Sequence, residues 1–180
     1  LIDDGASNDR LARKQVFYNY YAYDDGTAEL AYGLGNLVEP GYVALKFDVK
    51  MGDTLQAIQI YLNPVTEDLS DETVNLVVWA GANQPEEILW MSPDTNLFYS
   101  GGINYFYNYD LDTSLYIPAG PVFVGWKQQP VTNQIFSVGF DQRTDVSDRL
   151  FYNLGTTWAQ SSIPGAVMVR PTFGRAYDWQ

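Results

Sequence analysis

Two segments of this chain are apolar on both of their faces, and this feature constrains the fold more than any other. They are TVNLVVWAG at residues 73–81 and PVFVGWKQ at residues 121–128. Because the side chains of a β-strand point alternately to opposite faces, each segment places large apolar residues on both sides. Leu76 and Val124 therefore need cover, which predicts that both segments are central strands of a packed sheet structure.

The rest of the chain consists of short alternating segments divided by Gly, Pro and Asn. We expect further strands near residues 15–21, 41–49, 54–63, 88–91, 104–111, 113–118, 135–141, 149–153 and 167–170. About ten short strands at intervals of roughly 8–12 residues are typical of an antiparallel β-sandwich. There is no strand–helix alternation and no internal repeat, so we predict an all-β antiparallel sandwich with jelly-roll-like connectivity.

Two of these strands carry local predictions. The apolar positions of residues 54–63 change face near Ala57, which predicts a β-bulge at that point. The last strand is expected to end before Pro171, because proline lacks the N–H group that a sheet ladder needs.

The segment QVFYNYYAYDDGTAELAYG at residues 15–33 joins two aromatic stretches through an acidic turn. Asp24 and Asp25 followed by glycine favour a turn, because Asp side chains accept hydrogen bonds from nearby backbone N–H groups. Arg170 ends an otherwise apolar strand and needs a partner if it is buried. A carboxylate such as Asp24 or Asp25 would tie the opening turn to the closing strand.

The length of 180 residues suits one domain, which we place at residues 15–175. A chain of this size buries roughly 70% of the surface that its unfolded form exposes. We expect the polar residues 1–14 to be a linker or the tail of a preceding domain, and residues 176–180 to be a C-terminal tail. Aromatic residues make up 16% of the chain and include 14 tyrosines, which favours strands over helices.

Charge and composition exclude several classes of function. The net charge of −12 argues against binding to nucleic acid phosphates and to anionic membranes, both of which need clustered basic residues. No apolar stretch is long enough to span a bilayer. The chain has no cysteine, so disulfides, thiolate nucleophiles and cysteine-based zinc sites are also excluded.

Histidine is absent too, and the remaining enzymatic option is a pair of carboxylates of the kind that cleaves glycosides. Candidates for such a pair are Asp24, Asp25, Glu29, Asp141, Asp145 and Asp148. In a chain with 22 acidic residues, two carboxylates lie close together by chance, so this pattern identifies no catalytic residue. We therefore expect the chain not to be an enzyme.

Acidic loops also suggest a structural calcium site. Asp24, Asp25 and Glu29 are the first candidate ligands, because they lie between two segments that must both be fixed to the sandwich, and carboxylates are the ligands that Ca²⁺ prefers. Asp68-x-x-Asp71-Glu72 and Asp141-x-x-x-Asp145-x-x-Asp148 are further groups of this kind. The alternative is that these residues cap turns or line solvated loops.

Aromatic residues suggest a flat sugar-binding face. Exposed rings that stack on sugars are typical of such sites, with amides nearby. The candidate residues are Trp90, Tyr99, Tyr105, Tyr107 and Tyr109, together with Asn104 and Asn108. The alternative is that these tyrosines pack across strands and keep their hydroxyls at the rim. Trp79, Trp126 and Trp158 are expected to pack in the core.

Five stretches of the chain carry a resemblance to a known family. They are QVFYNYYAYDDGTAELAYG at 15–33, LQAIQIYLNP at 55–64, IPAGPVFVGWKQ at 117–128, FYNLGTTWAQS at 151–161 and GAVMVRP at 165–171. With these stretches in this order, the chain resembles a β-sandwich module of large exported Bacteroidetes proteins, located ahead of the C-terminal sorting domain of type IX secretion.

The resemblance implies a non-catalytic accessory module of a secreted or cell-surface protein, in contact with neighbouring domains of its parent chain. It implies no catalytic residue. The alternative from the residues themselves is a carbohydrate-binding module that takes polysaccharide on exposed Trp and Tyr side chains. A glycoside-acting enzyme with paired carboxylates is a more distant alternative.

Overall fold

The computed structural model describes residues 19–35, 37–64, 69–99, 101–130 and 136–174. In these residues the chain is all-β, with antiparallel sheets packed against each other, which confirms the predicted β-sandwich. The described residues contain no α-helix, and a single 3₁₀ turn, η1 (Ser147–Arg149), precedes one strand. The predicted linker at residues 1–14 and the tail at residues 176–180 lie outside the described residues.

The larger layer is a seven-stranded antiparallel sheet. In spatial order it consists of β11 (Trp158–Gln160), β10 (Leu150–Asn153), β2 (Gly41–Val49), β8 (Gly120–Gln128), β4 (Thr73–Ala80) and β5 (Glu87–Met91), with β6 (Thr95–Asn96) also paired to β4. The two strands predicted to be central therefore have strand neighbours on both sides, and the predicted edge strand, β5, lies at an edge.

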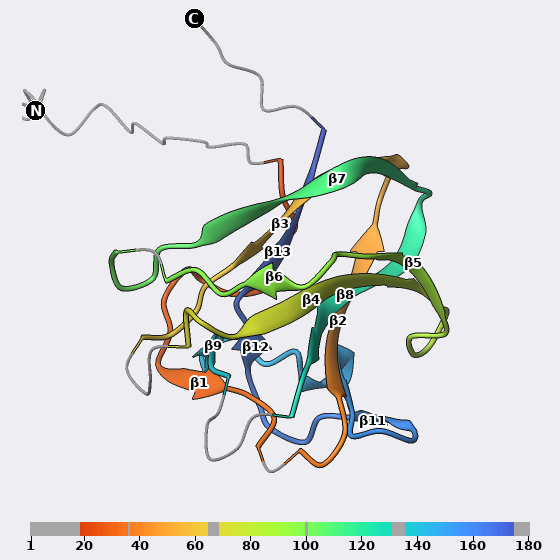
Figure 1. The fold of residues 1–180 in the computed structure, drawn as a ribbon. Coiled ribbons are helices and arrows are strands. Elements are labelled where there is room, and N and C mark those ends of the chain that lie inside the picture. Colours follow the sequence, from red (N-terminus) through yellow and green to blue (C-terminus); the bar gives the residue numbers. More distant parts are fainter. Residues whose placement is uncertain (1–18, 36, 65–68, 100, 131–135, 175–180) are drawn as a thin grey trace, which may run out of the picture.

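The opposite layer is built from two three-stranded sheets. One contains β13 (Val169–Phe173), β3 (Asp53–Ile60) and β7 (Tyr107–Ile117), and the other contains β1 (Leu30–Tyr32), β9 (Val138–Asp141) and β12 (Ala166–Val167). Met168 alone separates β12 from β13, and backbone hydrogen bonds join Tyr61, Gly139 and Met168 across the break. Figure 1 shows β7, β3 and β13 together on one side of β4, β8 and β2.

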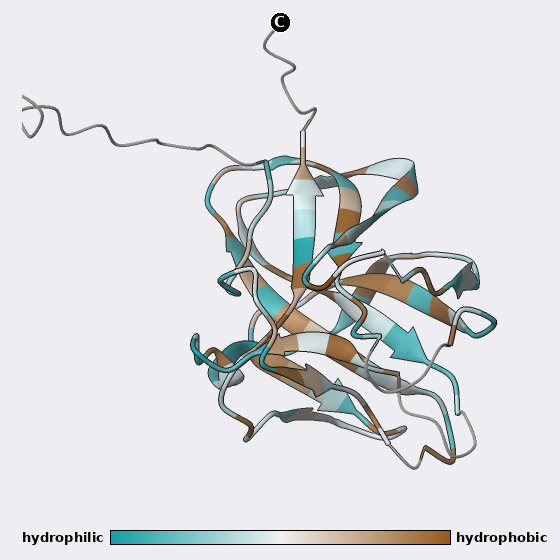
Figure 2. Cartoon of the chain, turned by 90° about the vertical axis from the view of Figure 1, so that its left-hand side faces the viewer, coloured by the Kyte–Doolittle hydropathy of each residue, from teal (hydrophilic) through white to brown (hydrophobic). Residues whose placement is uncertain are grey.

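The main core fills the space between these layers. Leu76 of β4 and Val124 of β8 are 1% and 0% exposed, and they pack with apolar side chains from the strands of both small sheets. Figure 2 shows hydrophobic residues concentrated along the strands in the middle of the molecule. The alternation seen in the sequence is therefore the pattern that fixes which face of each strand meets the other layer.

The outer face of the large sheet carries a second apolar cluster. Val77, Trp79 and Phe123 are buried there with alanine and phenylalanine neighbours, and the Trp158 ring meets Trp79 edge-on at 5.5 Å. This confirms that β4 and β8 are covered on both faces. Trp79 and Trp126 are buried and Trp158 packs against the outer cluster, as predicted for all three tryptophans.

The connectivity nests one strand pair inside another. β2 and β3 follow each other in sequence but lie in different layers, and so do β7 and β8. Within the layers, β2 pairs with β8 and β3 pairs with β7. This is a jelly-roll-like feature. The predicted bulge is also present, because the β3–β7 register shifts between Leu55 and Ala57.

Several predicted strands differ in their bounds. Segments 104–111 and 113–118 are joined in one strand, β7, which runs from Tyr107 to Ile117. Residues 111–114 bulge opposite Gln56, so the polar side chains of Asp112, Thr113 and Ser114 do not end the strand. The aromatic strand predicted at 15–21 is described only from Asn19 onward, where Tyr20 forms an isolated bridge. Ile135 lies outside the described residues, and β9 begins at Val138.

The prediction that the last strand ends before Pro171 is wrong. Pro171 lies inside β13, which is the edge strand of its sheet, and its carbonyl accepts a hydrogen bond from the Tyr21 N–H at 3.1 Å. Because the N and O atoms of a strand residue point to the same side, the missing N–H of Pro171 faces the N-terminal segment and removes no bond to β3.

The same edge brings the two ends of the described chain together. The N–H of Phe173 donates to the Asn19 carbonyl at 2.6 Å, and Tyr20 bridges Thr172 in antiparallel fashion. The chain therefore enters and leaves the sandwich side by side.

Candidate functional site

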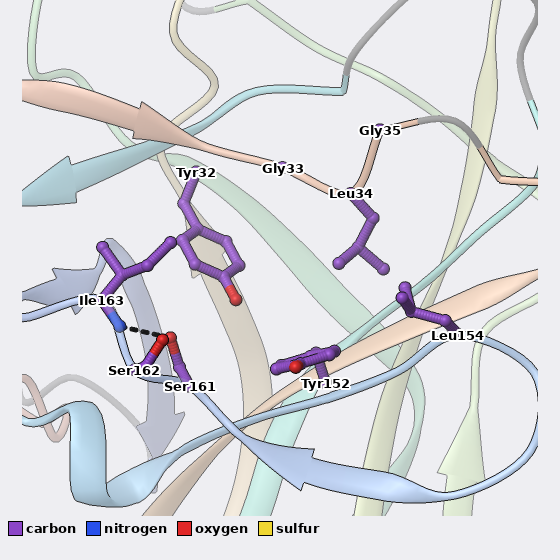
Figure 3. Close-up of a pocket in the computed structure, with 9 residues that line it drawn as sticks. All are labelled: Tyr32, Gly33, Leu34, Gly35, Tyr152, Leu154, Ser161, Ser162 and Ile163. Atoms are coloured by element: carbon purple, nitrogen blue, oxygen red, sulfur yellow. Dashed lines mark hydrogen bonds between the residues drawn. The ribbon is translucent and has the colours of Figure 1, made fainter.

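A pocket opens where the edges of the two layers meet, between β1 and β10. Its volume is about 230 Å³. The residues that line it are Tyr32, Gly33, Leu34, Gly35, Tyr152, Leu154, Ser161, Ser162 and Ile163 (Figure 3). The pocket is therefore formed by β1 of the opposite layer, β10 of the larger layer and the loop that follows β11.

Strand pairing holds the two tyrosines in place. Tyr32 is opposite Val138 in the β1–β9 pair, and its ring stacks on Phe140 with centroids 5.4 Å apart. Tyr152 is opposite Val43 in the β10–β2 pair. Both rings therefore belong to the sheet framework rather than to free loops.

The remaining walls are fixed by hydrogen bonds. The Ser161 N–H donates to the Leu150 carbonyl at 2.7 Å, and the Ile163 N–H donates to Ser161 Oγ at 3.2 Å. On the other side, the buried Gln128 Nε2 donates to the Leu34 carbonyl at 2.8 Å. These contacts hold the loop and the β1–β2 connection in fixed positions around the cavity.

The pocket is uncharged and amphipathic. Its polar side chains are the hydroxyls of Tyr32, Tyr152, Ser161 and Ser162, whereas its apolar side chains are Leu34, Leu154 and Ile163. Burial raises the pKa of Tyr32 and outweighs the opposing effect of its hydrogen bond with Ser161, so this phenol is neutral at physiological pH. The lining residues can form neutral hydrogen bonds, but none of them carries a carboxylate for acid–base chemistry.

A second polar arrangement lies at the edge strand β13. Arg170 is 9% exposed, and its Nε donates to Asp24 Oδ2 at 3.1 Å while Nη2 donates to Asp24 Oδ1. Nη1 donates to the Tyr20 hydroxyl at 3.2 Å. The guanidinium carbon lies 3.8 Å from the centre of the Phe106 ring. The predicted link between the opening turn and the closing strand is confirmed, with Asp24 as the partner.

The other predicted calcium ligands also have protein partners. Asp25 accepts hydrogen bonds from the Thr27 N–H and hydroxyl and pairs with Arg143, which lowers its pKa. Glu29 lies 3.1 Å from Arg143 Nε and accepts from the Gln142 N–H. Within the described ranges, no group of three acidic side chains is arranged to hold a metal ion. The calcium site stays a prediction.

The acidic residues considered for catalysis have local structural contacts. Asp141 is fully buried and accepts hydrogen bonds from the backbone N–H groups of Asp25 and Arg143. Asp145 accepts from the Ser147 N–H at 3.0 Å, which lowers its pKa. Asp148 lies in the 3₁₀ turn η1. These contacts are typical of residues that cap turns.

The five predicted sugar-binding aromatics do not form one exposed row. Tyr109 is buried, and Tyr107 lies against it edge-on at 4.7 Å. The Tyr99 hydroxyl accepts from the Leu69 N–H, and Trp90 Nε1 donates to Asp112 Oδ1 at 2.8 Å.

Tyr105 is the most exposed of the set, at 68%. The predicted Asn104 also has a structural contact, because its Oδ1 accepts from the Ala28 N–H at 2.9 Å. Asn108 Nδ2 donates to Asp110 Oδ1 on the exposed face of β7. Sugar binding by these residues stays a prediction.

Sequence reasoning did not single out the pocket. Tyr32 and Tyr152 are far apart in the chain and come from strands of different sheets, so only the tertiary fold brings them together. The one local signal is the pair of glycines around Leu34, which indicates close packing. The structure shows close packing at Leu34, because a Cβ atom added at Gly41 would lie 2.7 Å from Leu34 Cδ1.

Comparison with known proteins assigns no role to this site. No protein-family model matches the chain, and no curated protein and no solved structure gives a significant match. Among the described residues, no helix has the length and apolar character needed to cross a membrane.

Proposed function

We propose that this chain is a non-catalytic accessory module of a secreted or cell-surface protein, and that it contacts neighbouring domains of its parent chain. The observation that carries this proposal is the use of acidic residues for structural contacts. Asp24, in a buried pair with Arg170, ties the opening turn to the closing strand, and Asp141 holds two backbone N–H groups. Residues with such roles are not free to act on a substrate.

Protonation supports the same proposal. The pKa values of Asp25, Asp48 and Asp145 lie below the usual range of a carboxyl group, because each accepts hydrogen bonds from backbone groups, hydroxyls or arginine. Glycosidases that use two carboxylates need one of them protonated near neutral pH, which requires a raised pKa. These three residues are ionised at neutral pH and are unsuited to that role.

Export is supported by the resemblance described above. The chain has no cysteine, so its stability rests on non-covalent contacts, chiefly the core between the two layers. The proposed partners are the neighbouring domains of the parent protein, as the resemblance implies.

The test combines an activity assay with a folding assay. The purified chain is incubated with a panel of polysaccharides, and reducing ends are counted while unfolding in urea is followed by tryptophan fluorescence. We expect cooperative unfolding and no release of reducing ends. Hydrolysis that is abolished by Asp141→Asn or Asp145→Asn would replace this proposal with the enzymatic one.

Carbohydrate binding on exposed aromatics is the second candidate, favoured by the exposed ring of Tyr105 and the half-buried ring of Trp90. Glycan-array screening compares the native chain with Trp90→Ala, Tyr105→Ala and Tyr107→Ala variants. Tyr116→Ala is the matched control, since Tyr116 is 65% exposed but lies outside the predicted set. Binding that is lost in the first three variants and kept in the control would establish this function, and a blank array would leave the accessory proposal standing.

A further inference from the structure

We propose that the pocket between β1 and β10 binds one small, uncharged ligand rich in hydroxyl groups, of the size of a single sugar ring. This goes beyond the accessory function, because a module that only contacts neighbouring domains needs no ligand. It also differs from the flat aromatic face considered above, because it uses none of those residues.

The size of the cavity limits the ligand. Pockets for drug-sized ligands have volumes of roughly 300 Å³ and upward. The volume of this pocket is about 230 Å³. A single six-membered ring with its substituents is therefore the appropriate scale, whereas a polymer segment of several sugars is too large. A free monosaccharide or the terminal residue of a chain satisfies this limit.

The lining matches the two kinds of surface on a sugar. Figure 3 shows the Tyr32 hydroxyl directed toward the space above Tyr152, with Ser161 and Ser162 on one side and Leu34 and Leu154 on the other. Serine and tyrosine hydroxyls both donate and accept hydrogen bonds, so they can pair with sugar hydroxyls in either sense. The leucine side chains offer contact to the C–H groups of the ring.

The charges of the pocket and of the chain argue against ionised ligands. The lining contains no Asp, Glu, Lys, Arg or His, and the whole chain carries a net charge of −12. An anionic ligand would be repelled by the overall field and would find no cation among the lining residues. A cationic ligand would find no carboxylate among them. A neutral ligand meets neither cost.

The site is pre-organised and lies away from the chain ends. Tyr32 and Ser161 are 7% and 5% exposed, and β1, β10 and the loop after β11 are fixed by the hydrogen bonds described above. In Figure 1, β1 and β11 lie at the opposite end of the molecule from the point where β13 leads out of the sandwich. A ligand can therefore reach the pocket while neighbouring domains occupy the other end.

The test is an amide NMR titration of the complete chain with glucose, galactose, mannose, fucose and N-acetylglucosamine. Glucuronate serves as the charged comparison and glycerol as the non-specific polyol. We expect at least one neutral sugar to produce saturable shifts of the Tyr152, Ser162 and Ile163 amides. The expected Kd is on the order of 1 mM, which is usual for a ligand of so few atoms.

Two variants locate the binding. Ser162→Trp fills the mouth of the pocket from an exposed position and is expected to weaken binding more than tenfold. Thr156→Trp, on the exposed neighbouring loop and outside the lining, is the matched control and is expected to bind like the native chain. Tyr152→Phe removes one hydroxyl and is expected to weaken binding about fivefold, as the loss of one hydrogen bond does.

Three results would overturn the proposal: no saturable shift with any neutral sugar, equal binding of glucuronate, or unchanged binding in Ser162→Trp. None of them bears on the accessory function, which is tested separately by the polysaccharide-cleavage assay and by the glycan array with the aromatic variants.

Discussion

Two polar regions of this sandwich differ in how completely their side chains are paired. At the edge strand β13, Arg170 lies on the face of its sheet that is turned away from the main core, where it is paired with Asp24 and covered by the rings of Tyr20 and Phe106. Between β1 and β10, hydroxyls and leucines line a cavity instead. We refer to these regions as the sealed edge and the open edge.

The two edges differ in whether their polar groups can change hydrogen-bonding partners. A buried charge needs its partner permanently, because the desolvation of an unpaired ion costs several kcal/mol. A neutral hydroxyl can exchange one hydrogen-bonding partner for another at little cost. The sealed edge is therefore suited to stability and the open edge to reversible binding. Most of the predictions below test this contrast.

The largest effect is expected at the sealed edge. Arg170→Ala leaves the carboxylate of Asp24 buried without its partner. We expect the free energy of unfolding to fall by about 3–5 kcal/mol, which urea unfolding followed by tryptophan fluorescence measures. The control is Arg143→Ala, because the Arg143 side chain is 68% exposed. Its loss should cost less than about 1 kcal/mol, and equal effects of the two variants would contradict the contrast.

The next largest effect on the free energy of unfolding is expected from alkaline pH, through Tyr109 in the main core. Burial raises the pKa of Tyr109 to about 12 from 10.0. The pKa of Tyr109 is higher in the folded state than in the unfolded state, so burial of the neutral phenol contributes fully to the free energy of unfolding below pH 10. This contribution is lost as the pH rises toward 12.

The shift corresponds to roughly 2–3 kcal/mol of unfolding free energy. Urea unfolding between pH 9 and pH 12 tests the expectation, and Tyr109→Phe should remove this part of the pH dependence. Tyr116→Phe alters an exposed phenol and should leave it unchanged. A Tyr109→Phe curve that parallels the native one would show that another group is responsible.

A smaller effect is expected from the ring that covers Arg170. Phe106→Leu keeps an apolar side chain of similar size but removes the aromatic face that lies 3.8 Å from the guanidinium. Cation–π contacts contribute about 0.5–2 kcal/mol, so we expect the unfolding free energy to fall by that amount. If Phe106→Leu has the same effect in an Arg170→Met background, the ring acts through packing alone.

At the open edge, substitutions should hardly affect stability. Ser162→Ala and Leu154→Ala change exposed residues. Each should alter the unfolding free energy by less than about 0.5 kcal/mol in the same urea titration, as surface substitutions usually do. A loss greater than about 2 kcal/mol, which is typical of buried sites, would show that the open edge is part of the stabilising framework.

Calcium should have the smallest effect. The guanidinium groups of Arg143 and Arg170 already pair with Asp24, Asp25 and Glu29. We therefore expect the melting temperature to change by less than about 1 °C between millimolar Ca²⁺ and chelator, because only an ion bound to the native state adds stability. A rise of several degrees that chelator reverses would establish the calcium site predicted from the acidic turn.

The layers of the fold could be predicted from the sequence because they depend on alternation. β2 and the covered strands β4 and β8 follow directly from apolar periodicity, and the bulge at Ala57 follows from a change of parity within one strand. The Arg170 partner could be predicted because a buried cation and a nearby carboxylate are strongly constrained by desolvation.

The strand boundaries and the pocket could not be predicted, because they depend on neighbours. Pro171 breaks a strand in general, but here its missing N–H faces the N-terminal segment at a sheet edge. The polar run Asp112, Thr113 and Ser114 separates two apolar segments in the sequence, but it bulges from one long strand. The pocket requires Tyr32 and Tyr152 to meet across two sheets, and neither local pattern contains that information.

The hydrogen bond between Phe173 and Asn19 determines how this domain responds to mechanical force. Tension transmitted along the polypeptide through these two residues acts on adjacent antiparallel segments and pulls their hydrogen bonds apart one at a time. Separation of the two segments begins at Phe173 of β13, at the opposite end of the molecule from the cavity beside β1. Tension applied to both ends of the domain would therefore separate Asn19 from Phe173 before any other strand pair is strained.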